Sequence, residues 1–239
     1  MSSPRLSVIV PAYNEEKRIG ETLKYIINYL SKQEYSWEIV VVDDGSRDRT
    51  SQTVKDLGLA GVRVVRNDPN LGKGGSVKRG MLEAKGEFRL FCDADNATPF
   101  EEIEKFWPAI NEKNVVIGSR YMKGSNIVIE QTFLRRLLSR LGNILVQIIL
   151  LPGLPDTQCG FKMFTGESAE RIFPRQTVNR WGFDMEILYI ARKLGYKVRQ
   201  VPVNWYDRTG STLQSSNVFL KTFSELLKIR WNGIAGRYR

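Results

Sequence analysis

Short apolar runs alternate with amphipathic segments through the first 92 residues of the chain. Each run is rich in Val, Ile or Phe and is bounded by polar or glycine-containing turns, which predicts a buried strand. The predicted strands are Leu6–Val10, Trp37–Val42, Val62–Val65 and Glu87–Phe91. Helices are predicted between them, the first ending near Leu30, the second over Asp48–Leu57 and the third ending near Ala84. Strands that are apolar throughout and alternate with helices predict a parallel sheet with helices on both faces.

The pattern is looser after Asn96 but still predicts alternating elements. Strands are predicted over Asn114–Ile117 and Lys197–Val203, and helices over Phe100–Ile110, Gln131–Leu151, Phe183–Leu194 and Val218–Ile229. A chain of 239 residues is long enough for one large α/β domain and short for two. We therefore predict one α/β domain over residues 1–213, followed by a basic amphipathic helical segment over residues 214–239.

Polar clusters follow three of the predicted strands, at Pro11–Glu15, Asp43–Ser46 and Asp93–Asn96. Ligands of parallel α/β sheets bind beyond the carboxyl ends of the strands, so these clusters mark a candidate site. Within the first of them, Asn14 is expected to cap the following helix.

Asp93 and Asp95 are two residues apart at a strand end, so their carboxylates point to the same side. Two like charges held this close are unfavourable unless a cation lies between them. Carboxylate oxygens suit Mg²⁺ or Mn²⁺, which also take oxygens from substrate phosphates. The hypothesis is a metal-bridged diphosphate at this strand end, and the alternative is a solvated acidic turn.

The composition narrows the classes of function. The chain has 36 Lys and Arg against 26 Asp and Glu, a net charge of +10 that favours an anionic partner. It has no histidine, which excludes Ser-His and Cys-His catalysis and His-ligated zinc. Cys92 and Cys159 lie in apolar surroundings and are expected to be buried thiols in a reducing compartment. With no signal-peptide pattern and no run of 18 apolar residues, we expect a cytoplasmic protein without a membrane-spanning helix.

Four motifs occur in an order that resembles glycosyltransferase family 2. They are Val8–Glu15, Val41–Ser46, Asn70–Gly74 and Asp93–Asp95. Three later segments, Gly118–Arg120, Asp156–Phe161 and Trp181–Asp184, look like the branch that makes polyprenyl-phosphate sugars, and most like dolichyl-phosphate β-glucosyltransferases. The resemblance covers roughly residues 5–215. It implies the GT-A fold, a Rossmann-like, mostly parallel sheet, and an inverting, metal-dependent transfer of a hexose.

The resemblance also implies a role for each matched position. Pro11, Tyr13 and Glu15 would form one wall of the nucleotide site, and Asp44 would bond to the base. Lys73 would lie near the nucleotide, in a glycine-rich loop over 67–75. Asp93 would hold the ribose side and, with Asp95, the divalent metal, Mg²⁺ or Mn²⁺.

One departure from the family bears on the donor. Mannosyl relatives commonly place a glutamine two residues after the second aspartate, where this chain has Ala97. This favours a UDP-sugar, with glucose as the hexose, over GDP-mannose. It leaves the third protein ligand of the metal unidentified, and Gln158 is a candidate.

The acceptor implied by the resemblance is a polyprenyl (dolichyl) phosphate. Such a phosphate is largely dianionic at neutral pH, since its second pKa is about 6, so it can attack without a base. Arg120 and Arg208 match acceptor-binding positions, and guanidinium groups bind phosphate bidentately. Asp156 matches an acidic position near the reacting centre, as a base or as an orienter of those arginines.

The lipid acceptor implies contact with a membrane surface. Residues 214–239 combine Phe and Trp with Lys and Arg, which suits an anionic lipid interface, and Gln131–Leu151 carries an apolar stripe with an arginine face. Packing of both helices on the core is the alternative. We expect peripheral attachment at the cytoplasmic face of a membrane, or a separate membrane protein as partner.

Several readings compete with a lipid acceptor. A glycan hydroxyl acceptor would need a base, for which Asp156 and Asp184 are candidates, and a polyprenyl-phosphate mannose synthase would use GDP-mannose. A nucleotidyltransferase is disfavoured, because its glycine-rich loop usually follows the first strand directly. A nucleic-acid-binding protein is disfavoured because the basic residues are scattered among acids, without a basic-aromatic platform, so no nucleic acid partner is expected.

Overall fold

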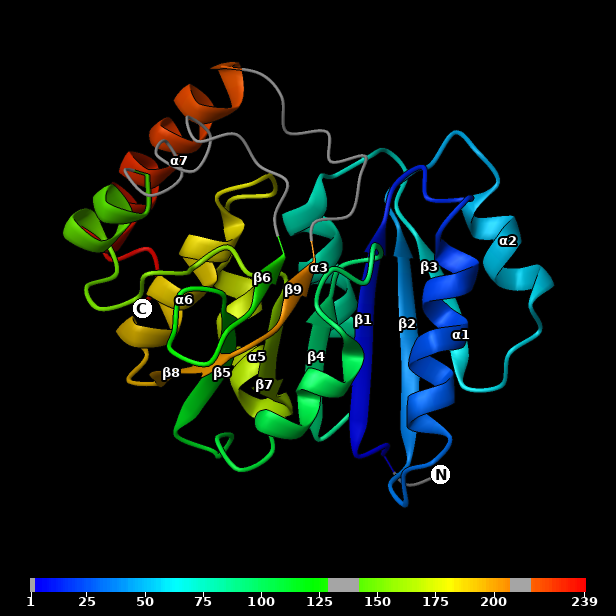
Figure 1. Cartoon of the computed structure of the whole chain (residues 1–239). Helices are drawn as coiled ribbons and strands as arrows, with labels where there is room; N and C mark the ends of the chain where they lie inside the picture. The colour runs from blue at the N-terminus through cyan, green and yellow to red at the C-terminus, as the bar shows by residue number, and fades with distance from the viewer. Residues whose placement is uncertain (1–2, 129–141, 207–215) are drawn as a thin grey trace.

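The computed structural model describes residues 3–128, 142–206 and 216–239 (Figure 1). Its main body is a seven-stranded sheet in the order β3-β2-β1-β4-β7-β5-β8. The strands are β1 (Leu6–Ala12), β2 (Trp37–Asp43), β3 (Val62–Arg66), β4 (Phe88–Cys92), β5 (Asn114–Ser119), β7 (Phe161–Thr165) and β8 (Lys197–Pro202). Two short strands, β6 (Ile127–Val128) and β9 (Trp205–Tyr206), form a separate parallel pair. The predicted α/β class and GT-A-like, mostly parallel sheet are confirmed.

Strand β7 is the feature of the sheet that the hydrophobic pattern did not predict. It pairs antiparallel with both β4 and β5. It is only five residues long and follows a loop, so its own pattern carries little signal. Because β7 runs the other way, its first residue, Phe161, lies at the edge where β4 and β5 end. The loop before β7 therefore joins the candidate site.

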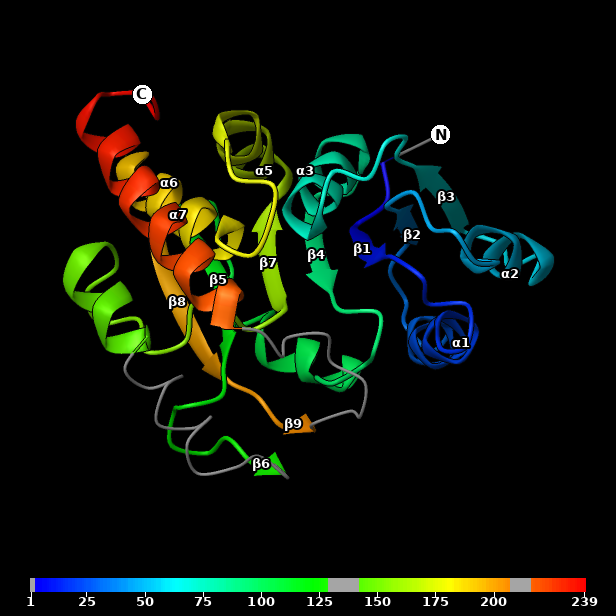
Figure 2. The ribbon, with the colours of Figure 1, turned by 90° about the horizontal axis from the view of Figure 1, so that it is seen from above.

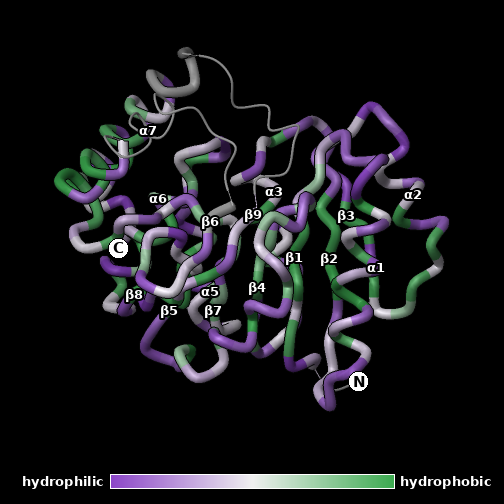
Figure 3. The backbone as a smooth tube through the Cα atoms, viewed as in Figure 1, coloured by the Kyte–Doolittle hydropathy of each residue, from purple (hydrophilic) through white to green (hydrophobic). Residues whose placement is uncertain are grey.

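Helices cover both faces of the sheet and build two cores (Figure 2). One face packs against α1 (Ile19–Leu30), α2 (Thr50–Asp56) and the 3₁₀ helix η1 (Phe100–Lys105). The other packs against α3 (Lys73–Glu83), α5 (Gly166–Ile172), η2 (Phe173–Arg175), α6 (Phe183–Lys193) and α7 (Ser216–Ile234). Hydrophobic residues make up most of β1, β2 and β4, and hydrophilic residues are concentrated in the loops beyond these strands (Figure 3). This division places the polar clusters of the sequence at one edge.

Two local predictions are wrong. Asn14 does not cap α1, which begins at Ile19; Asn14 has φ 56°, and its side-chain oxygen accepts a hydrogen bond from the Arg47 amide. Lys73 does not lie in a loop but is the first residue of α3, after Gly72 at φ 88°. In both places a side chain predicted from local spacing is held by a contact with a distant segment. The expected burial of the two thiols is confirmed, since Cys92 and Cys159 are both buried and form no disulfide.

The two predicted surface helices each pack one face and expose apolar residues on another. Residues 142–149 are helical, and the rest of the predicted helix before them lies outside the described residues. Val146 is buried there, whereas Ile148, expected on the apolar stripe, is 73% exposed. Helix α7 buries Leu226, Ile229 and Asn232 and exposes Phe223, Leu227, Trp231 and Ile234. None of the helices in the described part of the chain is long and apolar enough to cross a membrane.

Candidate active site

The site is assembled at the carboxyl-end edge of the sheet from five segments. The ends of β1, β2, β4 and β5 contribute, as does the loop of residues 156–160 that leads into β7. This loop, which we call the 156–160 loop, contacts the segments that follow the two neighbours of β7 in the sheet. Asp156 contacts the segment after β5, and Gly160 lies against the segment after β4.

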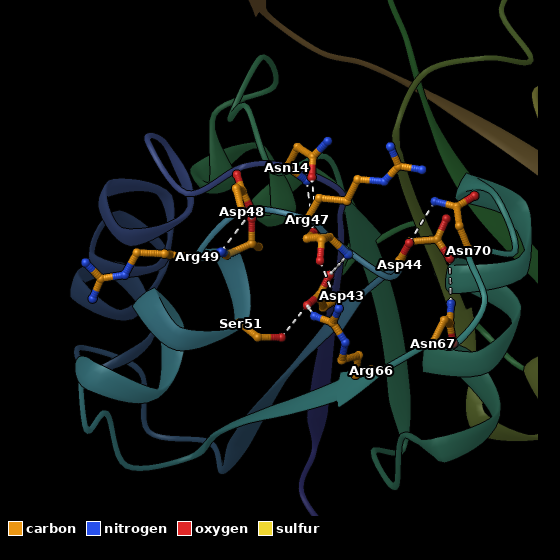
Figure 4. A network of polar contacts seen from close by, with 12 residues as sticks. Asn14, Asp43, Asp44, Arg47, Asp48, Arg49, Ser51, Arg66, Asn67 and Asn70 are labelled. Atoms are coloured by element: carbon orange, nitrogen blue, oxygen red, sulfur yellow. Dashed lines mark hydrogen bonds and ion pairs between the residues drawn. The ribbon is translucent and has the colours of Figure 1, made fainter.

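Two adjacent aspartates at the end of β2 are both buried, and each contacts different neighbours (Figure 4). Asp43 is fully buried, accepts a hydrogen bond from the Ser46 amide at 2.8 Å, and pairs with Arg66 at 2.6 Å. Asp44 accepts hydrogen bonds from the amides of Leu71 and Gly72, at 2.9 and 2.8 Å. The Asp44 carboxylate thereby fixes the segment that leads into α3 and Lys73. Its bonding to a nucleotide base stays a prediction.

The end of β1 forms the neighbouring wall. Pro11 is buried in register with Val42, whereas the Tyr13 side chain is 44% exposed at the surface. Glu15 accepts two hydrogen bonds from the Arg18 guanidinium, at 2.7 and 2.8 Å. Arg18 was not singled out from the sequence, although its spacing of three residues from Glu15 is the helical pairing distance. The pair brings a positive charge into the field of Asp95.

The acidic pair at the end of β4 lies beside a lysine. The Lys73 ammonium is 2.5 Å from a carboxylate oxygen of Asp93. Burial lowers the pKa of Lys73, but the charges of Asp93 and Asp184 outweigh this effect and raise it to about 12. Burial raises the pKa of Asp95, and the negative charge of Asp93 adds to the increase. A second cation near the two aspartates would therefore be electrostatically favourable.

The donor set fits a divalent metal that takes its remaining ligands from a substrate. Asp93 and Asp95 supply oxygen ligands only, as Mg²⁺ and Mn²⁺ prefer. Within residues 3–128, 142–206 and 216–239, no group of three or more His, Cys, Asp or Glu side chains could hold a metal alone. A Cβ on Gly160 would lie 2.1 Å from an Asp93 carboxylate oxygen, so the absence of a side chain there leaves this carboxylate its space. The two aspartate carboxylates, together with oxygens of a bound diphosphate, would supply the ligands of such a metal.

A buried ion pair links the site to the start of α6. Lys162 is fully buried on β7, and its ammonium donates to the Cys159 carbonyl at 2.6 Å and to the Asp184 carboxylate. Burial raises the pKa of Asp184, an effect that the charges of Lys162 and Lys73 oppose. Because Lys162 also donates to the Cys159 carbonyl, this ion pair fixes the end of the 156–160 loop. Sequence reasoning considered Asp184 only as a base and did not single out Lys162, whose partner is 22 residues away.

Arg120, the predicted acceptor-binding residue, is held in place by a buried carboxylate and two aromatic rings. The Nε and Nη2 atoms of Arg120 donate to the two carboxylate oxygens of Asp156, at 2.8 and 2.9 Å. The guanidinium carbon lies 5.3 Å from the ring centroid of Trp205 and 5.8 Å from that of Tyr121. Burial raises the pKa of Asp156, but the charge and hydrogen bonds of Arg120 outweigh it and lower the pKa. A carboxylate with a lowered pKa is a weak base, so this geometry favours an orienting role for Asp156 over proton abstraction.

Three further predicted positions complete the comparison with the sequence. Ala97 is buried, and its backbone joins Asp95 to β9: its amide donates to Asp95 and its carbonyl accepts from Tyr206. Gln158 is exposed on the 156–160 loop, two residues from the glycine that backs Asp93. Arg208 lies outside the described residues.

An acidic pair, a lysine and an arginine thus gather at the carboxyl-end edge of a Rossmann-like sheet, where sheets of this class bind their ligands. The fold resembles a glucosyl-3-phosphoglycerate synthase from Mycobacterium tuberculosis solved with Mn²⁺, UDP-glucose and phosphoglyceric acid, with a TM-score of 0.70 and 19% identity over 95% of this chain and 80% of that chain. It also resembles a mannosyl-3-phosphoglycerate synthase from Rubrobacter xylanophilus, with a TM-score of 0.71 and 16% identity over 98% of this chain and 75% of that chain.

The sequence matches are more specific. The model of glycosyl transferase family 2 matches residues 7–173, and the chain belongs to this family. Curated relatives named dolichyl-phosphate beta-glucosyltransferase are 39% identical in Dictyostelium discoideum, over 98% of this chain and 76% of the relative. The relative from Homo sapiens is 37% identical over 98% of this chain and 78% of its own length. The relative from Saccharomyces cerevisiae is 36% identical over 98% of this chain and 76% of its own length. The protein is therefore a glycosyltransferase, as the resemblance predicted.

Proposed function

We propose that this enzyme transfers glucose from UDP-glucose to a polyprenyl (dolichyl) phosphate. The observation that carries the proposal is the 156–160 loop, which supplies the counter-ion of Arg120 at one end and backs Asp93 at the other. The loop would thereby hold two parts of the site at a fixed spacing. The part around Asp93, which would bind the diphosphate, is called the donor half, and the part around Arg120, which would bind the acceptor phosphate, is called the acceptor half. The names of the relatives, at 36–39% identity over nearly the whole chain, support the choice of glucose and of the lipid phosphate.

The donor half would bind the nucleotide and its diphosphate. Pro11, Tyr13 and Glu15 would line the nucleotide, and Asp44 would hold the segment that leads into α3 and Lys73 against it. Asp93 and Asp95 would hold Mg²⁺ or Mn²⁺, which when bound neutralises charge on the leaving diphosphate. The Lys73 ammonium, 2.5 Å from Asp93, would contribute a positive charge to the same group.

The acceptor half would position a dianionic phosphate for attack. Arg120 would bind it through the edge that Asp156 leaves unused, and Arg208 would add a second contact. Attack by a phosphate oxygen on the anomeric carbon, opposite the leaving nucleotide, forms the new glycosidic bond and breaks the old one with inversion. An α-linked donor then gives a β-linked product, in keeping with the names of the relatives. The phosphate has no proton to lose, so no catalytic base is required.

Attachment to a membrane surface is part of the proposal. The exposed apolar row on α7 runs beside the exposed basic residues Lys221, Lys228 and Arg230. Such a face suits an anionic cytoplasmic leaflet, with or without a separate membrane protein as partner. We expect co-sedimentation with vesicles containing phosphatidylserine, and weaker binding of Trp231→Ser, whose side chain is 66% exposed. Equal binding to neutral and anionic vesicles would contradict this attachment.

The decisive experiment offers the purified enzyme a panel of donors and acceptors. UDP-glucose, UDP-galactose and GDP-mannose are each combined with farnesyl phosphate or a glycan hydroxyl acceptor, with and without Mn²⁺. We expect product from UDP-glucose and farnesyl phosphate with metal present. Arg120→Ala should abolish transfer to the lipid phosphate and leave UDP affinity unchanged. Product formed only from GDP-mannose, or only on the hydroxyl acceptor, would favour the alternative transferases.

A further inference from the structure

A cavity of about 450 Å³ lies directly beside the arginine of the acceptor half. It lies between the segment that follows β5 and the helix of residues 142–149. Arg120, Tyr121, Asn143 and Gln147 contribute polar groups to its lining, and Met122, Ile144 and Pro155 contribute apolar walls. Its volume is within the range of small-molecule sites.

The polar end of the cavity has a fixed and partly unused hydrogen-bonding group. Two nitrogens of the Arg120 guanidinium are engaged by Asp156, and the described residues offer no hydrogen-bond partner to the third, Nη1. An unused donor on a residue that lines a cavity is expected where a polar ligand completes the site.

The rest of the lining argues against a soluble polar acceptor. Among the described residues that line the cavity, Arg120 is the single charged one. An acceptor with a second charged group would have to desolvate it without a charged partner, because the lining residues other than Arg120 are neutral, at a free-energy cost. An acceptor with one phosphate followed by hydrocarbon matches both ends of the cavity.

We infer that this cavity binds the isoprene units next to the phosphate of the acceptor, and that Ile144 is a specificity-determining residue. The inference rests on the proposed function and adds the path of the lipid. Beyond the cavity, a longer lipid chain would leave the protein on the side of the molecule that carries α7 (Figures 1 and 2). The exposed apolar row on α7 would bring this side to the membrane.

Ile144 and Ile148 provide a matched pair of variants. They are the same residue type, one helical turn apart, and 49% and 73% exposed, but only Ile144 is among the described residues that line the cavity. Neither Ile144→Ser nor Ile148→Ser should impair folding. The measurement is transfer from UDP-glucose in detergent to farnesyl phosphate and to ethyl phosphate, which lacks the hydrocarbon chain.

We expect Ile144→Ser to raise KM for farnesyl phosphate by about tenfold, because apolar contact is lost, with KM for UDP-glucose unchanged. The same variant should leave kcat/KM for ethyl phosphate unchanged. Ile148→Ser should behave as the wild type with both acceptors. Ile144→Trp, which narrows the cavity, should raise KM for farnesyl phosphate and leave kcat/KM for ethyl phosphate unchanged.

The outcomes separate this inference from the function beneath it. If the wild type uses farnesyl phosphate but Ile144→Ser and Ile148→Ser give the same KM, the cavity does not bind the prenyl chain, while the proposed function stands. If Ile144→Ser weakens ethyl phosphate equally, the effect belongs to the phosphate and not to the hydrocarbon, which also overturns the inference. A wild type that forms no product on any prenyl phosphate overturns both.

Discussion

Gly160 offers the most direct test of the site, because one methyl group there is aimed at Asp93. A Cβ at position 160 would lie 2.1 Å from Oδ2, 2.5 Å from Cγ and 2.7 Å from Oδ1 of Asp93. Ordinary van der Waals contact begins at about 3.4 Å, so in Gly160→Ala the carboxylate must move by about 1.3 Å. A metal–oxygen bond of about 2.1 Å does not survive such a displacement.

The cost should appear in activity more than in stability. The clash is with the end of a side chain, which can rotate away, so the free energy of unfolding should fall by only about 1 kcal/mol. Misplacement of a reacting geometry by about 1 Å reduces rates by about 100-fold. We therefore expect Gly160→Ala to lose at least about 100-fold in glucosyl transfer. It should also need more Mn²⁺ for half-maximal rate.

The assay measures the initial rate at saturating acceptor over a Mn²⁺ titration, and urea unfolding of the same preparations. Gly20→Ala is the control: Gly20 lies in α1, and its Cβ would meet nothing closer than 3.7 Å. This control should keep full activity and gain up to about 1 kcal/mol, because alanine favours the helix. Transfer by Gly160→Ala within threefold of the wild type would refute the placement of Asp93 in the donor site.

Three further predictions test other parts of the molecule. Asp156→Asn leaves Arg120 without its buried counter-ion, so it should cost about 3 kcal/mol in urea unfolding and raise KM for the lipid phosphate; unchanged KM would contradict the orienting role. Tyr238→Phe removes a hydrogen bond of 2.6 Å to buried Glu186, so it should lower stability by about 1 kcal/mol in thermal unfolding without changing kcat; an unaltered Tm would mean that the bond contributes nothing. Burial raises the pKa of Asp43, but hydrogen bonds from Ser46 and Ser51 outweigh it and lower the pKa; the stabilisation is therefore present above about pH 4 and lost as pH falls through the folded-state pKa. Asp43→Asn should thus be less stable than the wild type at pH 7 and should lose less stability on acidification, as measured by urea midpoints from pH 7 to 3; parallel pH profiles would show that Asp43 is not responsible.

The donor half of the site was largely predictable because its signals are local. The apolar run before Asp93 predicts a strand, and the spacing of Asp93 and Asp95 predicts two carboxylates on one side of its end. The polar clusters after β1 and β2 required only the rule that parallel strands end at a common edge. Even here, Lys73 was expected in a loop and is instead the first residue of α3. The segment before this helix is fixed by backbone amides that donate hydrogen bonds to Asp44.

The acceptor half was predictable only as a set of residue types. The family resemblance offered Asp156 as a base or as an orienter of Arg120, but only the structure shows the bidentate pair that joins them across 36 residues. The contact of Gly160 with Asp93 joins residues 67 positions apart, and it exists because β7 runs antiparallel beside β4. A glycine in a loop carries no local signal for a contact at such a separation.

By itself, the sequence determined the α/β class, the acidic pair, the lack of histidine chemistry and the amphipathic character of the last helix. These follow from periodicity and side-chain chemistry, which are set within a few residues of each position. The tertiary structure alone decided the reversal of β7, the burial of Lys162 against Asp184, and which apolar residues of α7 are exposed. Those features depend on which distant segments pair and pack. One pairing is favoured over the others by the sum of the contacts throughout the core, which no single stretch of sequence contains.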